Sequence, residues 1–522
     1  MAEEQSASNP VQTSSAARQA GSRVSLASRL AGREGDWLLL GLSLGGVALV
    51  LLITRLGGFL SDDSYYYIYP AREFAAGRGF NPSYIFAPLF PFVLALINGL
   101  GIDALIAARW LNALLFGVNI FLVGRVIRRS GVPAGFALLG AALVLLADVI
   151  AEAHGWVMSE AISFTFMLLS LDFCLAYLAS GARRAWWISA ICASLTVLAR
   201  YAAIPLIAAL CLELLIFSPS KRLLIRLKEA ALFGMVGLLP IALYWLRNQI
   251  TTGHVVRYQR YFIVPLTGEQ LTWFSYNWLS LFVPGRLLHG HEILALGLAL
   301  AGGAALLALV WWFYRRRWET VRDQGFRASV MLLIFVFGLD LLMLYLARGL
   351  TELDVFNSRY LVPLLMIFLM LMVLLAGRLW QVAGRRMQIA LVGFLAVFLA
   401  YYAFRTVDFA RTMMRIGLGY ANIGWHNSET IDYLHQHPEI THLVSTGEMG
   451  IYFWTGNKPK VISDFPNQQA MRDYICQNGA SLLLMDQMPV GIYGMTHNEA
   501  IRGLALVKQF NDSEMYRCAT EK

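Results

Sequence analysis

Residues 37–67 read WLLLGLSLGGVALVLLITRLGGFLSDDSYYY, and this stretch joins a membrane-length apolar run to two adjacent carboxylates. The apolar part is long enough to cross a hydrocarbon core of about 30 Å, which takes about 20 helical residues. It ends in Asp62 and Asp63, which are followed by Ser64 and three tyrosines. Because charge is costly at a membrane boundary, the aspartate pair is a candidate functional site.

The composition places the whole chain in the same class. Hydrophobic residues make up 58% and charged residues 14% of the 522 residues, and the mean hydropathy is +0.57. About eleven apolar runs of spanning length recur between Trp37 and Phe404. They are continuous rather than alternating, and only helices or closed barrels satisfy every backbone group in lipid. We therefore expect an all-α polytopic membrane bundle of about 11 transmembrane helices.

The positions of the basic residues predict the orientation of this bundle, because short cytoplasmic loops retain Lys and Arg. Arginines and lysines cluster at every second boundary, from the N-terminal tail to Arg385 and Arg386. This pattern predicts a cytoplasmic N-terminus in a bacterial-type inner membrane and an extracytoplasmic aspartate pair. The same arginines account for the net charge of +9, so we expect anionic membrane lipids and no nucleic acid as partners.

The changes in composition predict three regions. Residues 1–35 are rich in Ala, Ser and Arg without an apolar face, which predicts a disordered cytoplasmic tail. Residues 36–405 form the membrane domain, with extracytoplasmic loops at 59–103 and 248–292, the second of them amphipathic and aromatic. Residues 406–522 are more polar and alternate short apolar runs with helical segments, which predicts a small extracytoplasmic α/β domain.

Two cysteines of that last region, Cys476 and Cys518, lie in a part of the chain that an oxidising compartment would reach. Whether they pair depends on the distance between them in the fold. The sequence alone leaves both the paired and the free state open.

Polar residues with chemical potential gather at one predicted face of the membrane. Arginine forks are suited to holding phosphate, and a carboxylate is suited to accepting a proton. The combination predicts a reaction that involves an anionic lipid headgroup. The candidates are Asp62, Asp63, His154, Glu160, Arg200, Arg247 and Arg359.

Short motifs around these residues occur in an informative order. They are DDSYYY at 62–67 with AREFAAGRGF at 71–80, VMSEA at 157–161, ARY at 199–201, YWLRN at 244–248 and NSRYLVP at 357–363. In this order and spacing the chain resembles the C-type glycosyltransferases. It is similar to the bacterial protein O-mannosyltransferases and the lipid A aminoarabinose transferases, which use a polyprenyl-phosphate sugar as donor.

The resemblance implies an inverting transfer of a hexosyl or pentosyl group to an extracytoplasmic hydroxyl of a glycan, lipid or protein. In it Asp62 is the general base, and Asp63 orients the acceptor or holds a divalent cation together with Glu160. Glu160 and His154 support the acceptor or the metal. Many relatives have Asp-Glu where this chain has Asp-Asp, so the division of labour within the pair stays open.

The resemblance also assigns the donor phosphate to three arginines. These are Arg200, Arg247 and Arg359, with Arg359 as the first choice, because planar guanidinium groups stabilise charge on the leaving oxygen.

Each assignment has a structural alternative. The aspartates are also suited to capping a short helix, Glu160 and His154 to capping a later helix, and arginines at helix ends to marking topology. The tyrosines at 65–67 are typical of an interfacial aromatic belt. For the whole protein, the alternatives are a lipid-linked saccharide flippase or transporter and a non-catalytic polyprenyl-lipid-binding member of the fold.

Overall fold

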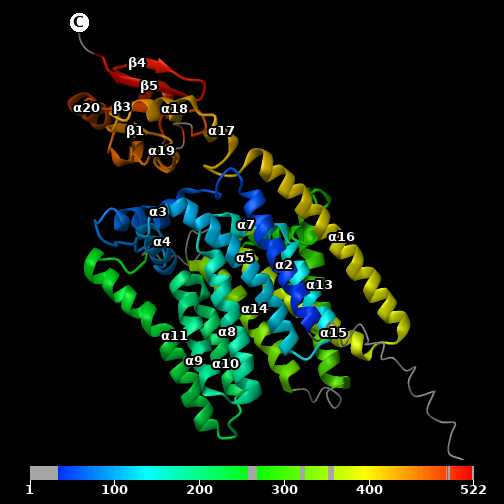
Figure 1. Ribbon diagram of the computed structural model, residues 1–522. Helices are drawn as coiled ribbons and strands as arrows, with labels where there is room; N and C mark the ends of the chain where they lie inside the picture. Colours follow the sequence, from blue (N-terminus) through cyan, green and yellow to red (C-terminus); the bar gives the residue numbers. More distant parts are fainter. Residues whose placement is uncertain are drawn as a thin grey trace, which may run out of the picture.

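The computed structural model is a helical bundle that carries a small α/β domain at one end (Figure 1). It describes residues 33–256, 267–317, 324–350, 358–488, 491 and 494–519. Residues 1–32, which make up most of the tail predicted to be disordered, lie outside the described residues. The first described helix, α2, already begins at Arg33.

The bundle consists of twelve described helices that are apolar or lie between apolar neighbours. They are α2 (Arg33–Ile53), α5 (Ala104–Arg129), α6 (Ala134–Leu145), α7 (Asp148–Gly155), α8 (Glu160–Ser180), α9 (Arg183–Ala199), α10 (Ile204–Phe217), α11 (Leu223–Thr252), α13 (Glu292–Arg317), α14 (Gln324–Leu350), α15 (Ser358–Val382) and α16 (Arg385–Ile416).

Within the described residues, seven of these helices are long and apolar enough to cross a membrane. There are eight if α6 and α7, which are bent by 59° at their junction, form one span. Shorter apolar helices accompany them. The polytopic helical bundle is therefore confirmed, whereas the number of about eleven spans stays a prediction.

Burial separates the inner helices from the outer ones. In both α8 and α15, 72% of the most apolar 18-residue window is buried inside the protein, compared with 6% in α16. A helix that is apolar all round is buried or faces lipid. We conclude that α8 and α15 form the centre and that α16 lies at the lipid-facing edge.

The side chain of Arg405 holds α16 to two other segments of the bundle. Arg405 donates from Nη2 to Asp148 Oδ2 at 2.9 Å, in the first turn of α7. Its Nη1 donates to the carbonyl oxygens of Ser280 and Leu281, at 2.9 and 3.0 Å, where α12 (Gly268–Ser280) ends. These polar contacts add to the apolar packing of one side of α16, where Tyr402 and Met413 are buried.

Two short helices, α3 (Asp62–Ala75) and α4 (Leu89–Gly99), lie at the end of the bundle that faces the α/β domain (Figure 1). Asp62 and Asp63 occupy the first turn of α3, where the helix dipole favours negative charge. The Ser61 amide donates to Ser64 Oγ at 3.1 Å and closes this turn. Successive residues of a helix point about 100° apart, so the two carboxylates have different surroundings.

The α/β domain begins after α16, later than the predicted residue 406. Its sheet has the strand order β2-β1-β3-β5-β4, in which β1 is parallel to β2 and β3, and β5 is antiparallel to β3 and β4. The strands are β1 (Leu443–Ser445), β2 (Lys460–Val461), β3 (Ser481–Met485), β4 (Leu504–Gln509) and β5 (Ser513–Cys518).

Five described helices accompany this sheet in the domain. They are α17 (Ile423–His426), α18 (Glu429–Gln436), α19 (Glu448–Thr455), α20 (Gln468–Asn478) and α21 (His497–Ala500). A disulfide between Cys476 and Cys518 joins α20 to β5. The pairing that the sequence left open is thus formed in the structure.

Phe59 and Leu60, which precede Ser61 and the aspartate pair, connect the bundle to this domain. The Phe59 amide donates to the carbonyl of Gly155 at 2.9 Å, and the Tyr420 amide donates to the carbonyl of Leu60 at 2.9 Å. We call the backbone contacts of Phe59 and Leu60 with these two segments the clip. A Cβ atom on Gly419, where φ is +62°, would lie 1.9 Å from the Leu60 oxygen. The clip therefore requires glycine at position 419.

Replacing this glycine should separate the domain from the bundle. Gly419→Ala adds a clash with the Leu60 oxygen to the ~1–2 kcal/mol that an L-residue loses at a left-handed φ. Gly479→Ala is the matched control, because its φ is +60° and a Cβ there meets nothing within 4 Å. In detergent, Gly419→Ala should lower the melting temperature more than Gly479→Ala and expose residues 417–422 to protease. Equal effects of the two variants would contradict the clip.

Candidate active site

Four charged side chains from distant parts of the chain meet at the domain-facing end of the bundle. Arg359 Nη1 donates to Asp63 Oδ2 at 2.9 Å, and Arg359 Nε donates to Glu160 Oε1 at 2.7 Å. Arg200 Nη1 lies 2.5 Å from the same Glu160 oxygen. Two carboxylates and two guanidinium groups thus form one cluster, which we call the charge cluster.

Helix ends deliver each member of the charge cluster. Glu160 is the first residue of α8, and Asp63 is in the first turn of α3. Arg200 follows α9 in an extended conformation with φ of −149° and ψ of 125°, and Arg359 is the second residue of α15. Because the four helix ends lie at one end of the bundle, residues far apart in sequence converge there.

Burial makes the charge cluster energetically demanding. Glu160 is only 1% exposed, and the side chains of Arg200 and Arg359 are 15% and 25% exposed. A buried carboxylate is tolerated when cations compensate its charge. Glu160 Oε2 is also buried and has no hydrogen-bond partner within the described residues. The two guanidinium groups therefore stabilise Glu160 through its other oxygen.

Asp62 has a different environment from Asp63. Its side chain is exposed, and its Oδ1 accepts a hydrogen bond from the hydroxyl of Tyr420 at 2.5 Å. Within the described ranges, no Lys, Arg or His forms an ion pair with Asp62. The pair at the start of α3 thus consists of one neutralised carboxylate and one carboxylate that keeps its charge available.

Arg247 lies outside the charge cluster. It donates from Nη2 to Asn81 Oδ1 at 2.9 Å and from Nη1 to Asn248 Oδ1 at 3.1 Å. Asn81 belongs to residues 76–88, which connect α3 to α4. In the part of the chain that the structure describes, no carboxylate pairs with Arg247, which contacts these two amide oxygens and the ring of Tyr244, 5.9 Å from its guanidinium carbon.

Two tyrosines hold the same connection close to the charge cluster. The Tyr244 hydroxyl donates to the carbonyl of Ser83 at 3.3 Å, and the Tyr201 hydroxyl donates to the carbonyl of Phe86 at 2.9 Å. The ring of Phe86 in turn lies 5.2 Å from that of Tyr67 on α3. Residues 76–88 therefore lie between Arg247 and the helix that bears the aspartates.

His154 is remote from this chemistry. Its side chain is fully buried, Nδ1 is 2.7 Å from the carbonyl oxygen of Ile150, and Nε2 is 2.9 Å from Asn119 Nδ2. A carbonyl only accepts, so Nδ1 carries the proton and Nε2 accepts from the amide. With both nitrogens occupied, His154 fits the structural alternative better than support of an acceptor.

The expected divalent cation does not fit the observed arrangement of its two predicted ligands. The Arg359 guanidinium group bridges Asp63 and Glu160, which were expected to hold the metal. Across the described ranges, no three His, Cys, Asp or Glu side chains come together as a metal site. A cation between these carboxylates would need Arg359 to move away from both of them.

Sequence reasoning missed Tyr420 and misread Tyr67. Tyr67 is 2% exposed, and its hydroxyl lies 3.4 Å from Ser159 Oγ. Burial, together with the Glu160 charge, raises the pKa of Tyr67, so it remains a neutral phenol. It is not part of an exposed aromatic belt. Tyr420 carried no local signal, because its partner is 358 residues earlier in the chain.

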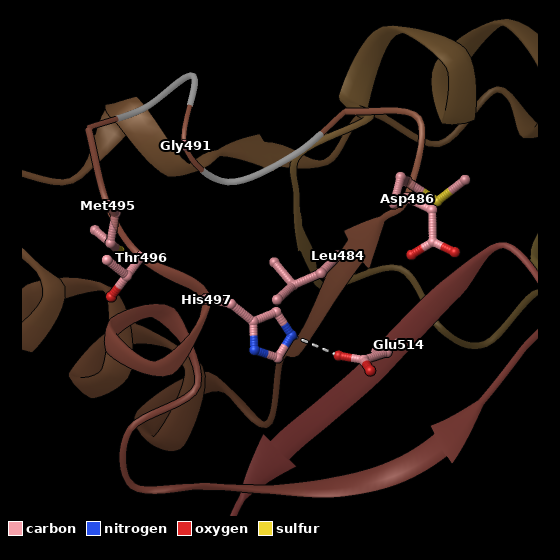
Figure 2. A pocket seen from close by; sticks show the side chains of 8 residues that line it. Leu484, Asp486, Gly491, Met495, Thr496, His497 and Glu514 are labelled. Carbon is pink, nitrogen blue, oxygen red and sulfur yellow. Dashed lines mark hydrogen bonds and ion pairs between the residues drawn. The ribbon is translucent and has the colours of Figure 1, made fainter.

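A pocket in the α/β domain holds the other notable pair of titratable groups (Figure 2). His497 Nε2 lies 2.7 Å from Glu514 Oε2, which also accepts a 2.6 Å hydrogen bond from the Tyr516 hydroxyl. This hydroxyl, followed by His497, lowers the pKa of Glu514. The pair is half exposed and joins α21 to β5. We assign it to the stability of the domain.

Comparison with known proteins supports the fold described above. Residues 86–245 match the family of dolichyl-phosphate-mannose-protein mannosyltransferases. ArnT from Cupriavidus metallidurans bound to undecaprenyl phosphate superposes with a TM-score of 0.55 at 13% identity, covering 92% of this chain and 97% of ArnT. The chain has the fold of a C-type membrane glycosyltransferase.

The apo form of the same ArnT gives a similar result. Its TM-score is 0.52 at 14% identity, and the alignment covers 93% of this chain and 98% of ArnT. Among the curated proteins, none matches this sequence. The resemblance to the C-type glycosyltransferases is thus confirmed at the level of fold, and the matched family segment includes Glu160 and Arg200 of the charge cluster.

Glu160→Gln should both destabilise the protein and reduce its activity. Breaking a buried ion pair by removing one partner costs about 3–5 kcal/mol, because the other charge stays buried. The control is Glu73→Gln, since Glu73 pairs with Arg78 on the exposed side of α3 at 2.7 Å and such pairs contribute little. Thermal unfolding in detergent should show a large loss for Glu160→Gln only. Similar melting temperatures for both variants would mean that the charge cluster does not hold the helix ends together.

Proposed function

We propose that the protein is an inverting glycosyltransferase that moves a sugar from a polyprenyl-phosphate donor to a hydroxyl group of an extracytoplasmic acceptor. The observation that carries this proposal is the contrast between the two aspartates. Asp63 is held by Arg359, whereas Asp62 is exposed and bound only by a phenol among the described residues. Asp62 is therefore the carboxylate suited to accept a proton.

The reaction proceeds by attack of the acceptor oxygen on the anomeric carbon of the donor. Asp62 takes the proton of the attacking hydroxyl as the new C–O bond forms. On the opposite face the bond between the anomeric carbon and the phosphate oxygen breaks, and its electron pair leaves with the polyprenyl phosphate. The polyprenyl phosphate leaves as a phosphate dianion, which is stable at neutral pH because the second pKa of a phosphate monoester is about 6, so no general acid is needed.

The charge cluster places fixed charged groups beside the reacting atoms. Its two guanidinium groups are balanced by two carboxylates, which leaves a preorganised but nearly neutral array beside Asp62. Arg359 still has N–H groups that can stabilise charge developing on the leaving oxygen. Asp63 acts through Arg359, which it holds at 2.9 Å.

Arg247 is better suited than Arg359 to be the first contact of the donor phosphate. Arg359 already binds two carboxylates, whereas the described partners of Arg247, two amide oxygens and an aromatic ring, are all uncharged. A guanidinium group that keeps its net charge attracts an anion more strongly than one that is neutralised. We therefore rank Arg247 ahead of Arg359 for binding and Arg359 ahead of Arg247 for transition-state stabilisation.

The proposed membrane orientation has independent support from the α/β domain. Its disulfide between Cys476 and Cys518 is typical of an oxidising compartment. The domain and α3, which carries Asp63 of the charge cluster, lie at the same end of the bundle (Figure 1). This arrangement supports an extracytoplasmic site in a bacterial-type inner membrane, with the N-terminus in the cytoplasm and lipid around the bundle.

Asp62→Asn should abolish transfer. Loss of a general base typically costs about 10²–10⁴-fold in rate, while Asp63→Asn should retain more activity, because Asp63 does not contact the acceptor. Purified protein is assayed for new glycosidic bonds with a panel of polyprenyl-phosphate sugars and hydroxyl acceptors. Wild-type rates in Asp62→Asn would remove the proposed base. Donor movement across proteoliposomes without a new bond would favour a flippase, and donor binding without either would favour a non-catalytic member.

Arg247→Ala should weaken donor binding more than turnover. We expect a KM for the donor at least tenfold higher, with partial recovery in Arg247→Lys because the positive charge is kept. Arg359→Ala should instead lower kcat. Arg78→Ala is the control. Arg78 is an exposed arginine in residues 76–88, the segment that Arg247 contacts, and it pairs with Glu73. An unchanged donor KM in Arg247→Ala would refute the ranking.

A further inference from the structure

We infer that the α/β domain completes the active site by supplying Tyr420 as the positioning residue of Asp62. This inference rests on the proposed function, in which Asp62 is the base. The contact crosses the boundary between the two parts of the protein: Tyr420 lies between α16 and α17, and Asp62 begins α3. Nothing in the membrane bundle among the described residues takes its place.

Tyr420 is held firmly before it reaches Asp62. Its amide donates to the carbonyl of Leu60 at 2.9 Å, and its own carbonyl accepts from Trp454 Nε1 at 2.9 Å. The ring is 7% exposed and packs against Trp425 and Phe453, with centroids 5.5 and 5.7 Å apart. The hydroxyl is therefore presented by a fixed backbone and a packed ring.

The same residue contacts the aspartate segment at two points. The Leu60 carbonyl and the Asp62 carboxylate are two residues apart, and Tyr420 donates to the first from its backbone and to the second from its side chain. Two hydrogen bonds from one residue define both the place and the direction of the first turn of α3. A single surface contact would leave the carboxylate free to rotate.

Other side chains of the domain hold α3 in the same way. The ring of Tyr452 on α19 lies 5.1 Å from that of Tyr65 and 5.4 Å from the Arg72 guanidinium carbon. Lys458 lies over the rings of Tyr65 and Tyr69, at 5.0 and 4.9 Å. The domain is thus docked along the helix that carries the proposed base.

The Tyr420 hydrogen bond has a direct chemical consequence. It occupies Oδ1 of Asp62, so the proton of the acceptor is taken by Oδ2. Removing the hydroxyl alone leaves the contact between Arg359 and Asp63, at 2.9 Å, without a changed partner.

Tyr420→Phe removes the hydroxyl and keeps the ring packing. We expect kcat to fall about tenfold or more, as for loss of a hydrogen bond to a charged group, with little change in donor KM. The split between kcat and KM distinguishes loss of orientation at Asp62 from loss of donor binding. Tyr433→Phe on α18 is the control and should match the wild type in both measurements.

A double variant separates this inference from the proposed function. If Tyr420 acts through Asp62, Asp62→Asn and Asp62→Asn/Tyr420→Phe should have equal residual activity. Full activity in Asp62→Asn would overturn the proposed function itself. An inactive Asp62→Asn together with a wild-type kcat in Tyr420→Phe would overturn only the role of Tyr420. A lower kcat in Tyr420→Phe together with a higher donor KM and a lower melting temperature would reduce Tyr420 to a docking residue, which also refutes the inference.

Discussion

The site depends on one buried carboxylate, Glu160 at the start of α8. An uncompensated charge at this depth would cost several kcal/mol, so the helix ends that carry Arg200 and Arg359 must approach it. Both guanidinium groups contact the same oxygen, at 2.5 and 2.7 Å. Because α8 and α15 are also the most buried helices, this electrostatic requirement and the apolar packing of the bundle favour the same arrangement.

Pairing within the charge cluster decides which charges are left for chemistry. Asp63 and Glu160 neutralise two arginines, which leaves Asp62 as a negative and Arg247 as a positive group whose described partners are all uncharged. A base and an anion-binding group that are separated in this way do not form an ion pair with each other. The sequence marked all of these residues by type, but the difference between neighbours such as Asp62 and Asp63 arises only from the fold.

Sequence patterns predicted the features that depend on neighbouring residues in the chain, such as apolar helices. Hydropathy is sufficient to predict a helical bundle, and the polar residues at one predicted membrane face gave seven candidates, of which two carboxylates and two arginines do meet. Which residues pair with each other could not be predicted from the sequence, because partners such as Glu160 and Arg359 are 199 residues apart in the chain. His154 is the opposite case. A histidine is often a functional residue, which made it a candidate, but both of its ring nitrogens form hydrogen bonds in the protein interior.

The position of the α/β domain follows from contacts that join α7, α16 and the two residues of the clip. Asp148 at the start of α7 holds Arg405 of α16, and Gly155 at the end of α7 holds Phe59. Leu60, the next residue, binds Tyr420, which follows the end of α16. Because these contacts connect α7, α16 and residues 59–60 to one another, none of the three can move without breaking a hydrogen bond. The position of α16 therefore fixes Tyr420, and Tyr420 fixes the start of α3, which carries the aspartates.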